Sequence, residues 1–342
     1  MDYKKTMEEI TAGLTGNSEI DIRYLNEQTE KYKNHELSKE ILRAIGRMLF
    51  DLLSGDKRDQ FAQAVENDTK SIEAVAENAN YQLQHGNTKK AVALLESIIP
   101  SIRTLYIDDD MTEYRDFEDP VENVIYVNAY HPTKNVVWQQ LNRAAIFRMY
   151  GYSLVELKRF EEAKAALETA LIFNPVSANT IFEYAELFKM TRTFQPFIKF
   201  TKKCLEYAYT PESIARAYRN LGYYYIEQGE FDIATALYYV SLDFDKNKQA
   251  SSELFFISQK TGDVPAQPNA DKVIELFEQE KIQLGASKLA LGSLAALSEQ
   301  SEREERYDLA LLFTKMLYRI DHHDSIAEKI SELEKRTKTQ KQ

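Results

Sequence analysis

The sequence predicts an all-α fold, an α-solenoid of stacked antiparallel helix pairs, and two observations support this prediction. The same residue types recur at the same offsets about every 34 residues, which is the period of a two-helix repeat. The 342 residues include only 11 glycines and 8 prolines, and 44% of them are hydrophobic, enough to bury an extended core. Each unit of such an array contacts only its neighbours, so the fold works by presenting a surface.

Two segments show the repeat most clearly. The first has its large and small residues at Phe147, Tyr150, Gly151, Leu154, Ala163, Leu167, Ala170 and Pro175. The second has the corresponding types at Tyr218, Leu221, Gly222, Tyr225, Ala234, Tyr238 and Ser241. We expect the glycine of each unit to lie where its two helices cross, because a branched side chain would hold the axes beyond about 8–10 Å.

Residues 1–66 have a helical pattern of their own, which we interpret as an N-terminal helical cap or degenerate repeats. Apolar residues form one stripe of a helix at Leu37, Ile41, Leu42, Ile45, Leu49 and Leu52. Ser54-Gly55 predicts the end of this helix, and a second helix is expected over about 59–67. Terminal repeats need a polar outer face, so departure from the pattern is expected here.

The remaining repeats differ in clarity. A repeat-like helix pair is expected over 67–101, with Ala79 in the glycine position. Three units fill 144–248, as 144–177, 178–214 and 215–248, and Pro196 falls in the first turn of a second helix, where a missing N–H costs little. Degenerate units are expected over 249–322, including a helix over 270–284 that Asn269 caps. A C-terminal helix and a basic tail complete the chain at 323–342.

The region 102–143 is predicted to be an acidic and extended inter-repeat segment. It carries eight carboxylates and one arginine between residues 108 and 122. Alternating apolar residues predict an extended chain over 124–130. The units that begin at Ile72 and Ala144 are about two periods apart, so part of this region could instead be a degraded repeat. A long loop between repeats is usually functional or disordered.

No constellation of residues supports a catalytic, metal or cofactor site, so the chain is not expected to be an enzyme. The carboxylates match five positions of a calcium loop, at Asp108, Asp110, Thr112, Asp116 and Asp119. However, Glu113 replaces the glycine of that loop and Asp119 replaces its final glutamate, which favours a solvated loop. His322-His323-Asp324 is interpreted as a helix C-terminus, where a cationic histidine is favourable, and Cys204 as a buried packing residue.

The repeated residues resemble the tetratricopeptide repeat (TPR) family over about 70–322. The resemblance implies a right-handed superhelix whose concave face, lined by the first helix of each unit, binds a peptide from a partner protein. Its inner-face positions imply peptide-binding residues at Arg148, Tyr152, Asn179, Arg216, Arg219, Asn220 and Tyr223. Arg216 and Asn220 resemble part of a clamp for a C-terminal carboxylate. Arg148, Tyr152 and Glu183 stand where a full clamp needs other residues, so such a clamp is not expected.

Two interpretations of the inner-face cations are open. The arginines could form a site for an anion or a peptide backbone, because a guanidinium suits bidentate carboxylate binding. Alternatively, they pair with glutamates of neighbouring helices as ordinary surface ion pairs, with Glu156, Glu183, Glu186 and Glu227 as the partners. Tyr152 and Tyr223 are the aromatic candidates for peptide contact, whereas Tyr150, Tyr218 and Tyr225 are expected in the core.

Composition narrows the function further. A net charge of −11 argues against a nucleic-acid partner. The sequence has neither a signal peptide nor a run of about 18 apolar residues, so no membrane association is expected. The single cysteine favours a reducing compartment, and a cytoplasmic location follows.

The predicted function is a non-enzymatic scaffold or adaptor that binds a partner peptide in its concave groove. The alternative is a cytosolic peptide or small-ligand sensor that regulates a partner protein. Apolar ends of a solenoid would also allow homo-oligomers to form.

Overall fold

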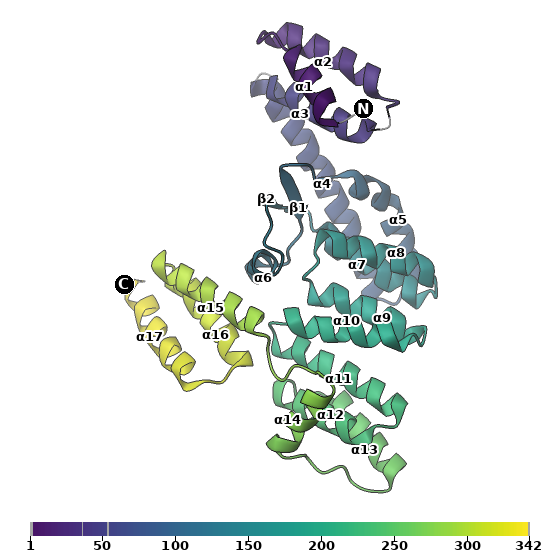
Figure 1. Cartoon of the computed structure of the whole chain (residues 1–342), viewed down its shortest axis with the longest axis vertical. Helices are drawn as coiled ribbons and strands as arrows, with labels where there is room; N and C mark the ends of the chain where they lie inside the picture. Colours follow the sequence, from purple (N-terminus) through teal and green to yellow (C-terminus); the bar gives the residue numbers. More distant parts are fainter. Residues whose placement is uncertain (1–2, 36, 53–54, 341–342) are drawn as a thin grey trace. The chain divides into compact units, whose positions relative to one another are not determined.

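A computed structural model describes residues 3–35, 37–52 and 55–340, and its helices follow one another as Figure 1 shows. These residues form seventeen α-helices and one parallel sheet of two short strands. The chain divides into two units, Met1–Glu77 and Asn78–Gln342. The architecture is that of an all-α solenoid, as predicted. None of the described helices is both long enough and apolar enough to cross a membrane.

The first unit has its own hydrophobic core, built by α1 (Tyr3–Ala12), α2 (Ser18–Tyr32) and α3 (Ser38–Leu52). The predicted apolar stripe is confirmed, since all of its residues belong to this core: Leu37, Ile41, Leu42, Ile45, Leu49 and Leu52. Asp21 closes the turn before α2, because its carboxylate accepts hydrogen bonds from the backbone N–H groups of Thr15 (2.7 Å) and Gly16 (2.9 Å).

The separate helix predicted over 59–67 is wrong. Helix α4 is continuous over Gly55–Gln84, and it includes the boundary between the two units. No glycine or proline interrupts residues 56–84, so nothing in the local chain breaks the helix near 67. The predicted stop at Ser54 lies outside the described residues.

The second unit begins with the end of α4, which is followed by α5 (Thr88–Thr104), and then consists mainly of helix hairpins. Their helices are α7 (Arg143–Glu156) with α8 (Phe160–Phe173), α9 (Ala178–Met190) with α10 (Phe194–Tyr207), α11 (Pro211–Gln228) with α12 (Phe231–Phe244), and α15 (Lys288–Arg303) with α16 (Tyr307–Ile320). Successive hairpins stack, with α8 on α9, α10 on α11 and α12 on α13 (Lys248–Thr261). Pro196 lies in the first turn of α10, as predicted.

The helix crossings confirm the predicted register of the repeat. A Cβ atom added to Gly151 would lie 2.5 Å from Cγ of Leu167, and one added to Gly222 would lie 2.8 Å from a ring carbon of Tyr238. In the C-terminal hairpin, α15 with α16, a hydrogen bond stands at the corresponding crossing: Oγ of Ser298 lies 2.7 Å from Oγ1 of Thr314. In each of these hairpins the small residue therefore meets the residue sixteen positions later.

Gly222→Val is expected to lower the free energy of unfolding of the second unit by about 1–3 kcal/mol through overpacking against the Tyr238 ring. Helix propensity alone predicts the opposite, because glycine is a poor helix former. Urea unfolding measures the change, and Gly292→Val is the matched control, since a Cβ there meets nothing within 4 Å. A variant at Gly222 that is more stable than the parent would contradict this register.

The region between α5 and α7 differs from the prediction. Strand β1 (Thr112–Arg115) pairs in parallel with β2 (Asn135–Trp138), and between them lies α6 (Pro120–Tyr130). The extended chain predicted over 124–130 is therefore helical, and one helix between two strands is not a degraded repeat. Asp119 caps α6 by accepting from the N–H groups of Val121 and Glu122, and His131 ends it with a φ of 46°.

A buried ion pair attaches this region to the start of α7. Arg143 and Asp116 both have fully buried side chains, and Nη2 of Arg143 lies 2.7 Å from Oδ1 of Asp116. The same guanidinium donates to the carbonyls of Leu105 and Tyr106, and Asp116 also accepts from the N–H of Ala144. Through Asp116, the segment before α6 is thus attached to the start of α7, and through Arg143 it is linked to the chain just after α5.

The C-terminal helices do not simply extend the stack, in contrast to the degenerate units predicted over 249–322. Helix α14 (Ala270–Gln279) packs against α12, and α15 packs against α6 and α10, as Figure 1 illustrates. The helix predicted over 270–284 is capped by Asn269 but ends at Gln279, because Lys281 adopts a φ of 51°. Helix α17 (Asp324–Gln340) packs on α16 and includes most of the predicted basic tail, whereas Lys341 lies outside the described residues.

Candidate peptide-binding surface

The first helices of the central hairpins bring most of the predicted site residues together. Helix α7 supplies Arg148 and Tyr152, α9 supplies Asn179, and α11 supplies Arg216, Asn220 and Tyr223. Within each helix the polar residues are three or four positions apart, which places them on one face. Hydrogen bonds connect α9 directly to α11, and Glu118 connects α7 to α9.

A ladder of polar contacts joins α9 to α11. Nη2 of Arg216 lies 3.1 Å from Oε1 of Glu183, and Nδ2 of Asn220 donates to Oε1 of Glu186 over 3.1 Å. Glu186 also pairs with Lys189, whose Nζ lies 4.6 Å from the centre of the Tyr223 ring. The structure therefore pairs Arg216 with Glu183 of the neighbouring helix, as the second interpretation of the cations expects, whereas Glu186 pairs with Lys189 of its own helix.

Arg148 and Asn179 share one partner that sequence reasoning missed. Glu118, from the acidic segment before α6, forms an ion pair with Arg148 and accepts a hydrogen bond from Nδ2 of Asn179 over 3.2 Å. The excess of carboxylates between residues 108 and 122 was the signal available in the sequence, but nothing local indicates which helices they reach. One end of the surface is therefore occupied by a carboxylate of the chain itself.

Two of the residues predicted for this surface are buried: Asn220, which is 6% exposed, and Arg219. The side chain of Arg219 is only 9% exposed, and its Nη1 lies 3.1 Å from Oδ2 of Asp245 at the end of α12. The position of Arg219 in the repeat suggested the inner face, yet its long side chain reaches the following helix instead. It fixes the α11–α12 hairpin and is not available to a ligand.

An open groove of about 370 Å³ lies where α4, α7 and α9 meet. Its lining combines predicted and unpredicted residues: Asn80, Leu83, Gln84, Arg148, Met149, Tyr152 and Glu183. Tyr152 is 43% exposed, and burial together with Glu156 and Glu183 raises the pKa of its hydroxyl. The groove therefore combines apolar and aromatic side chains with one cation, Arg148, and one carboxylate, Glu183.

The surface has an excess of negative charge. Its cations are Arg148, Lys189, Arg192 and Arg216, and its carboxylates are Glu118, Glu156, Glu183, Glu186, Glu227 and Glu253, which leaves a net charge of −2. Glu156, Glu227 and Glu253 have no hydrogen-bond or ion-pair partner in the part of the chain that the structure describes. Burial raises the pKa of Glu253, although Lys189 opposes this shift. Three of the cations are paired, whereas Arg192 and three of the carboxylates have no such partner among the described residues.

The carboxylates of the apparent calcium loop are used within the chain. Asp108 pairs with Arg115 at 2.9 Å, Asp116 pairs with Arg143, and Asp119 caps α6 while accepting a hydrogen bond from the Tyr209 hydroxyl (2.6 Å). No group of three or more potential ligands able to hold a metal occurs among the residues that the structure describes. The buried thiol of Cys204 has its pKa raised by desolvation, which makes it unreactive packing.

No protein-family model and no curated protein matches the chain. Among solved structures, it is similar to pilF of Pseudomonas aeruginosa at 15% identity, covering 77% of this chain and 97% of that chain with a TM-score of 0.42. It is also similar to MamA (13% identity, 66% and 96%, TM-score 0.36) and to the hetero-tetramer Cut9–Hcn1 of APC/C (14%, 88% and 57%, TM-score 0.33). The TPR-like character of the fold follows from the chain's own helix crossings.

Proposed function

We propose that this protein is a non-enzymatic scaffold or adaptor that binds a peptide segment of a partner protein on the surface formed by α7, α9 and α11. The observation that carries the proposal is the open groove at α4, α7 and α9, where exposed Tyr152 lies beside Leu83 and Met149. Tyrosine gives a large contact area at a small entropic cost, and such residues often dominate binding at interfaces.

The charges on this surface favour a basic peptide. Arg148 and Arg216 already have carboxylate partners, so an acidic peptide would have to displace Glu118 or Glu183. Glu156 and Glu227 have no partner among the residues that the structure describes, and a lysine or arginine of the ligand could bind them without breaking a contact seen there. The net charge of −11 would also attract a basic partner over longer distances.

Selection from a displayed library of random peptides tests this proposal, because such a selection does not require the partner to be identified first. We expect the enriched peptides to combine a large apolar residue with lysine or arginine. Tyr152→Ala should weaken their binding about tenfold or more, because truncating a central aromatic contact typically costs about 2 kcal/mol or more.

Tyr81→Ala is the matched control, because Tyr81 is also exposed and lies on α4 but does not line the groove. Isothermal titration calorimetry gives the affinities, and an unchanged melting temperature shows that both variants are folded. Enrichment of acidic peptides, or equal affinity for the parent and the Tyr152 variant, would move the binding surface elsewhere.

A further inference from the structure

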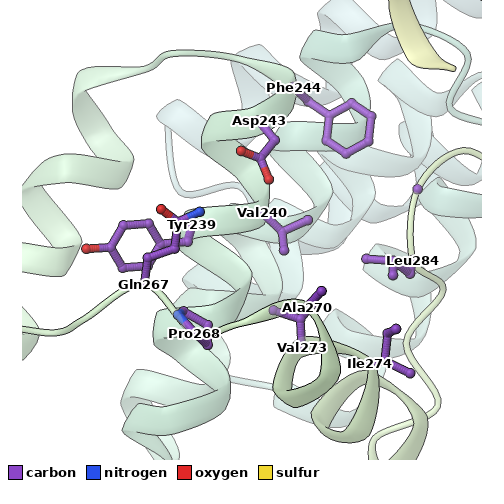
Figure 2. A pocket seen from close by; sticks show the side chains of 11 residues that line it. Tyr239, Val240, Asp243, Phe244, Gln267, Pro268, Ala270, Val273, Ile274 and Leu284 are labelled. Carbon is purple, nitrogen blue, oxygen red and sulfur yellow. The ribbon is translucent and has the colours of Figure 1, made fainter. Parts of the chain in front are cut away.

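A second pocket, of about 410 Å³, lies between α12 and α14 (Figure 2). Helix α12 contributes one wall, the linker before α14 and α14 itself contribute two more, and the segment after α14 closes the fourth. Apolar side chains dominate the lining: Val240, Phe244, Pro268, Val273, Ile274 and Leu284. Pockets of about 300–1,000 Å³ with mainly apolar walls are typical sites for small molecules.

The walls are fixed by hydrogen bonds to the main chain. The Tyr239 hydroxyl donates to the carbonyl of Pro265 over 2.8 Å, which holds the linker against α12. The Tyr218 hydroxyl donates to the carbonyl of Gln283 over 2.9 Å and accepts from the N–H of Gly285 over 2.7 Å. These contacts are made within the chain itself and fix the segments before and after α14, so binding would not require those segments to be ordered first.

Asp243 is the only charged residue among those that line this pocket. Figure 2 shows its side chain beside Val240 and Phe244. It has no hydrogen-bond or ion-pair partner within the described ranges, and desolvation raises the pKa of its carboxyl group. Asp243 is exposed to solvent although it lines the pocket, and a ligand that supplies a cation would form a charge-assisted hydrogen bond with it.

We propose that this pocket binds a small organic cation, in which a compact apolar body fills the space between α12 and α14 and a protonated amine pairs with Asp243. The volume accommodates roughly ten to fifteen non-hydrogen atoms. A neutral or anionic molecule of the same shape leaves the carboxylate unpaired or repels it. This site is separate from the proposed peptide-binding surface and shares no residue with its groove.

A set of amines and their alcohol counterparts tests the proposal on the full chain. The probes are butylamine, cyclohexylmethylamine and 2-phenylethylamine, each compared by ligand-observed NMR with the alcohol of the same size. We expect at least one amine to bind about fivefold or more tightly than its alcohol. Asp243→Asn should remove this preference, whereas Asp232→Asn should retain it, because Asp232 is also exposed on α12 but does not line the pocket.

A second variant tests the location of the site independently of charge. Ala270→Phe places a large ring at the pocket wall and should abolish binding of amine and alcohol alike, with circular dichroism as the check on folding. Three outcomes would overturn the proposal: no probe binds the parent at about 10 mM, amines and alcohols bind equally, or the preference survives Asp243→Asn. Binding of a lysine-containing peptide without binding of free amines would also overturn it, by making the pocket an anchor for a partner protein.

Discussion

Arg143→Met is expected to lower the free energy of unfolding of the second unit by about 3–5 kcal/mol, the cost of breaking a buried ion pair by removing one partner. The Arg143 side chain is fully buried and contacts Asp116 through both Nε (2.9 Å) and Nη2 (2.7 Å). It also donates to the carbonyls of Leu105 (2.6 Å) and Tyr106 (2.7 Å). The variant leaves these acceptors and one carboxylate buried without their donor.

The single tryptophan of the chain reports on this region directly. Trp138 lies on β2, and its Nε1 donates to the carbonyl of Phe117 over 2.9 Å, one residue after Asp116. Urea unfolding followed by Trp138 fluorescence therefore measures the stability around the ion pair. A loss below about 1 kcal/mol would show that water replaces the missing guanidinium and that the pair is not a major anchor.

The double variant Arg143→Met with Asp116→Asn separates two costs of the single variant. One is the loss of the contacts that Arg143 makes, and the other is the buried Asp116 carboxylate that is left without its arginine. Burial raises the pKa of Asp116 even beside its arginine, which shows how unfavourable this environment is for a carboxylate. If the stranded carboxylate causes most of the loss, the neutral amide should recover a substantial part of it. No recovery would attribute the loss to the carbonyl contacts of Arg143 and to its packing against Phe173, whose ring centre lies 4.0 Å from Cζ.

The hairpins could be predicted from the sequence because their determinants are local. Gly151 and Gly222 mark crossings that only a very small residue permits, and the partner residue follows sixteen positions later in the same hairpin. The same reasoning extends to Ser298, although the sequence gives no glycine there. The register of the two helices within one hairpin is thus determined by short-range steric constraints. These constraints are visible in the sequence as a repeating pattern of small and large residues.

Contacts between distant segments could not be predicted in the same way. Glu118 binds Arg148 and Asn179, which are 30 and 61 positions away, and no repeat relates these residues. The packing of α15 on α6 likewise joins elements that are not neighbours in the array. Helix α6 itself had a usable local signal in the cap Asp119 followed by Pro120, but the alternation of apolar residues after it favoured the wrong secondary structure.

The arrangement of the candidate surface could be predicted only in part, for a related reason. The repeat indicates which helix face a residue occupies, and it correctly groups Arg148, Tyr152 and Arg216. It does not indicate how far a long side chain reaches, so Arg219 was assigned to the surface although it binds Asp245. It also cannot show that a cation is already neutralised, which changes the expected ligand from acidic to basic.

Glu122→Gln is expected to stabilise the protein at pH 8 by about 2–3 kcal/mol more than at pH 5. Glu122 is only 2% exposed, and its Oε2 accepts from the N–H of Glu118 (2.7 Å) and from Nδ2 of Asn174 (2.6 Å). Burial, with the nearby charges of Glu118 and Asp119, raises its pKa from 4.5 to about 7. The amide keeps the acceptor oxygen but cannot ionise.

The sign follows from proton linkage. A carboxyl group whose pKa is higher in the folded state than in the unfolded state binds an extra proton on folding between pH 4.5 and 7. Its contribution to stability is therefore most favourable below about pH 4.5 and is lost as the pH rises through 7. Urea unfolding followed by Trp138 fluorescence at pH 5 and pH 8 measures the effect.

Glu161→Gln, an exposed change on α8, is the matched control and should alter stability equally at both pH values. A constant difference between the Glu122 variant and the parent at pH 5 and 8 would show that Glu122 does not titrate in this range. A pH-dependent difference would place the change at the start of α6, because the N–H of Glu118 is one of the donors to Glu122. Both donors stabilise the ionised form of Glu122, so its ionisation should keep the contact with the N–H of Glu118, the residue whose carboxylate occupies Arg148 and Asn179.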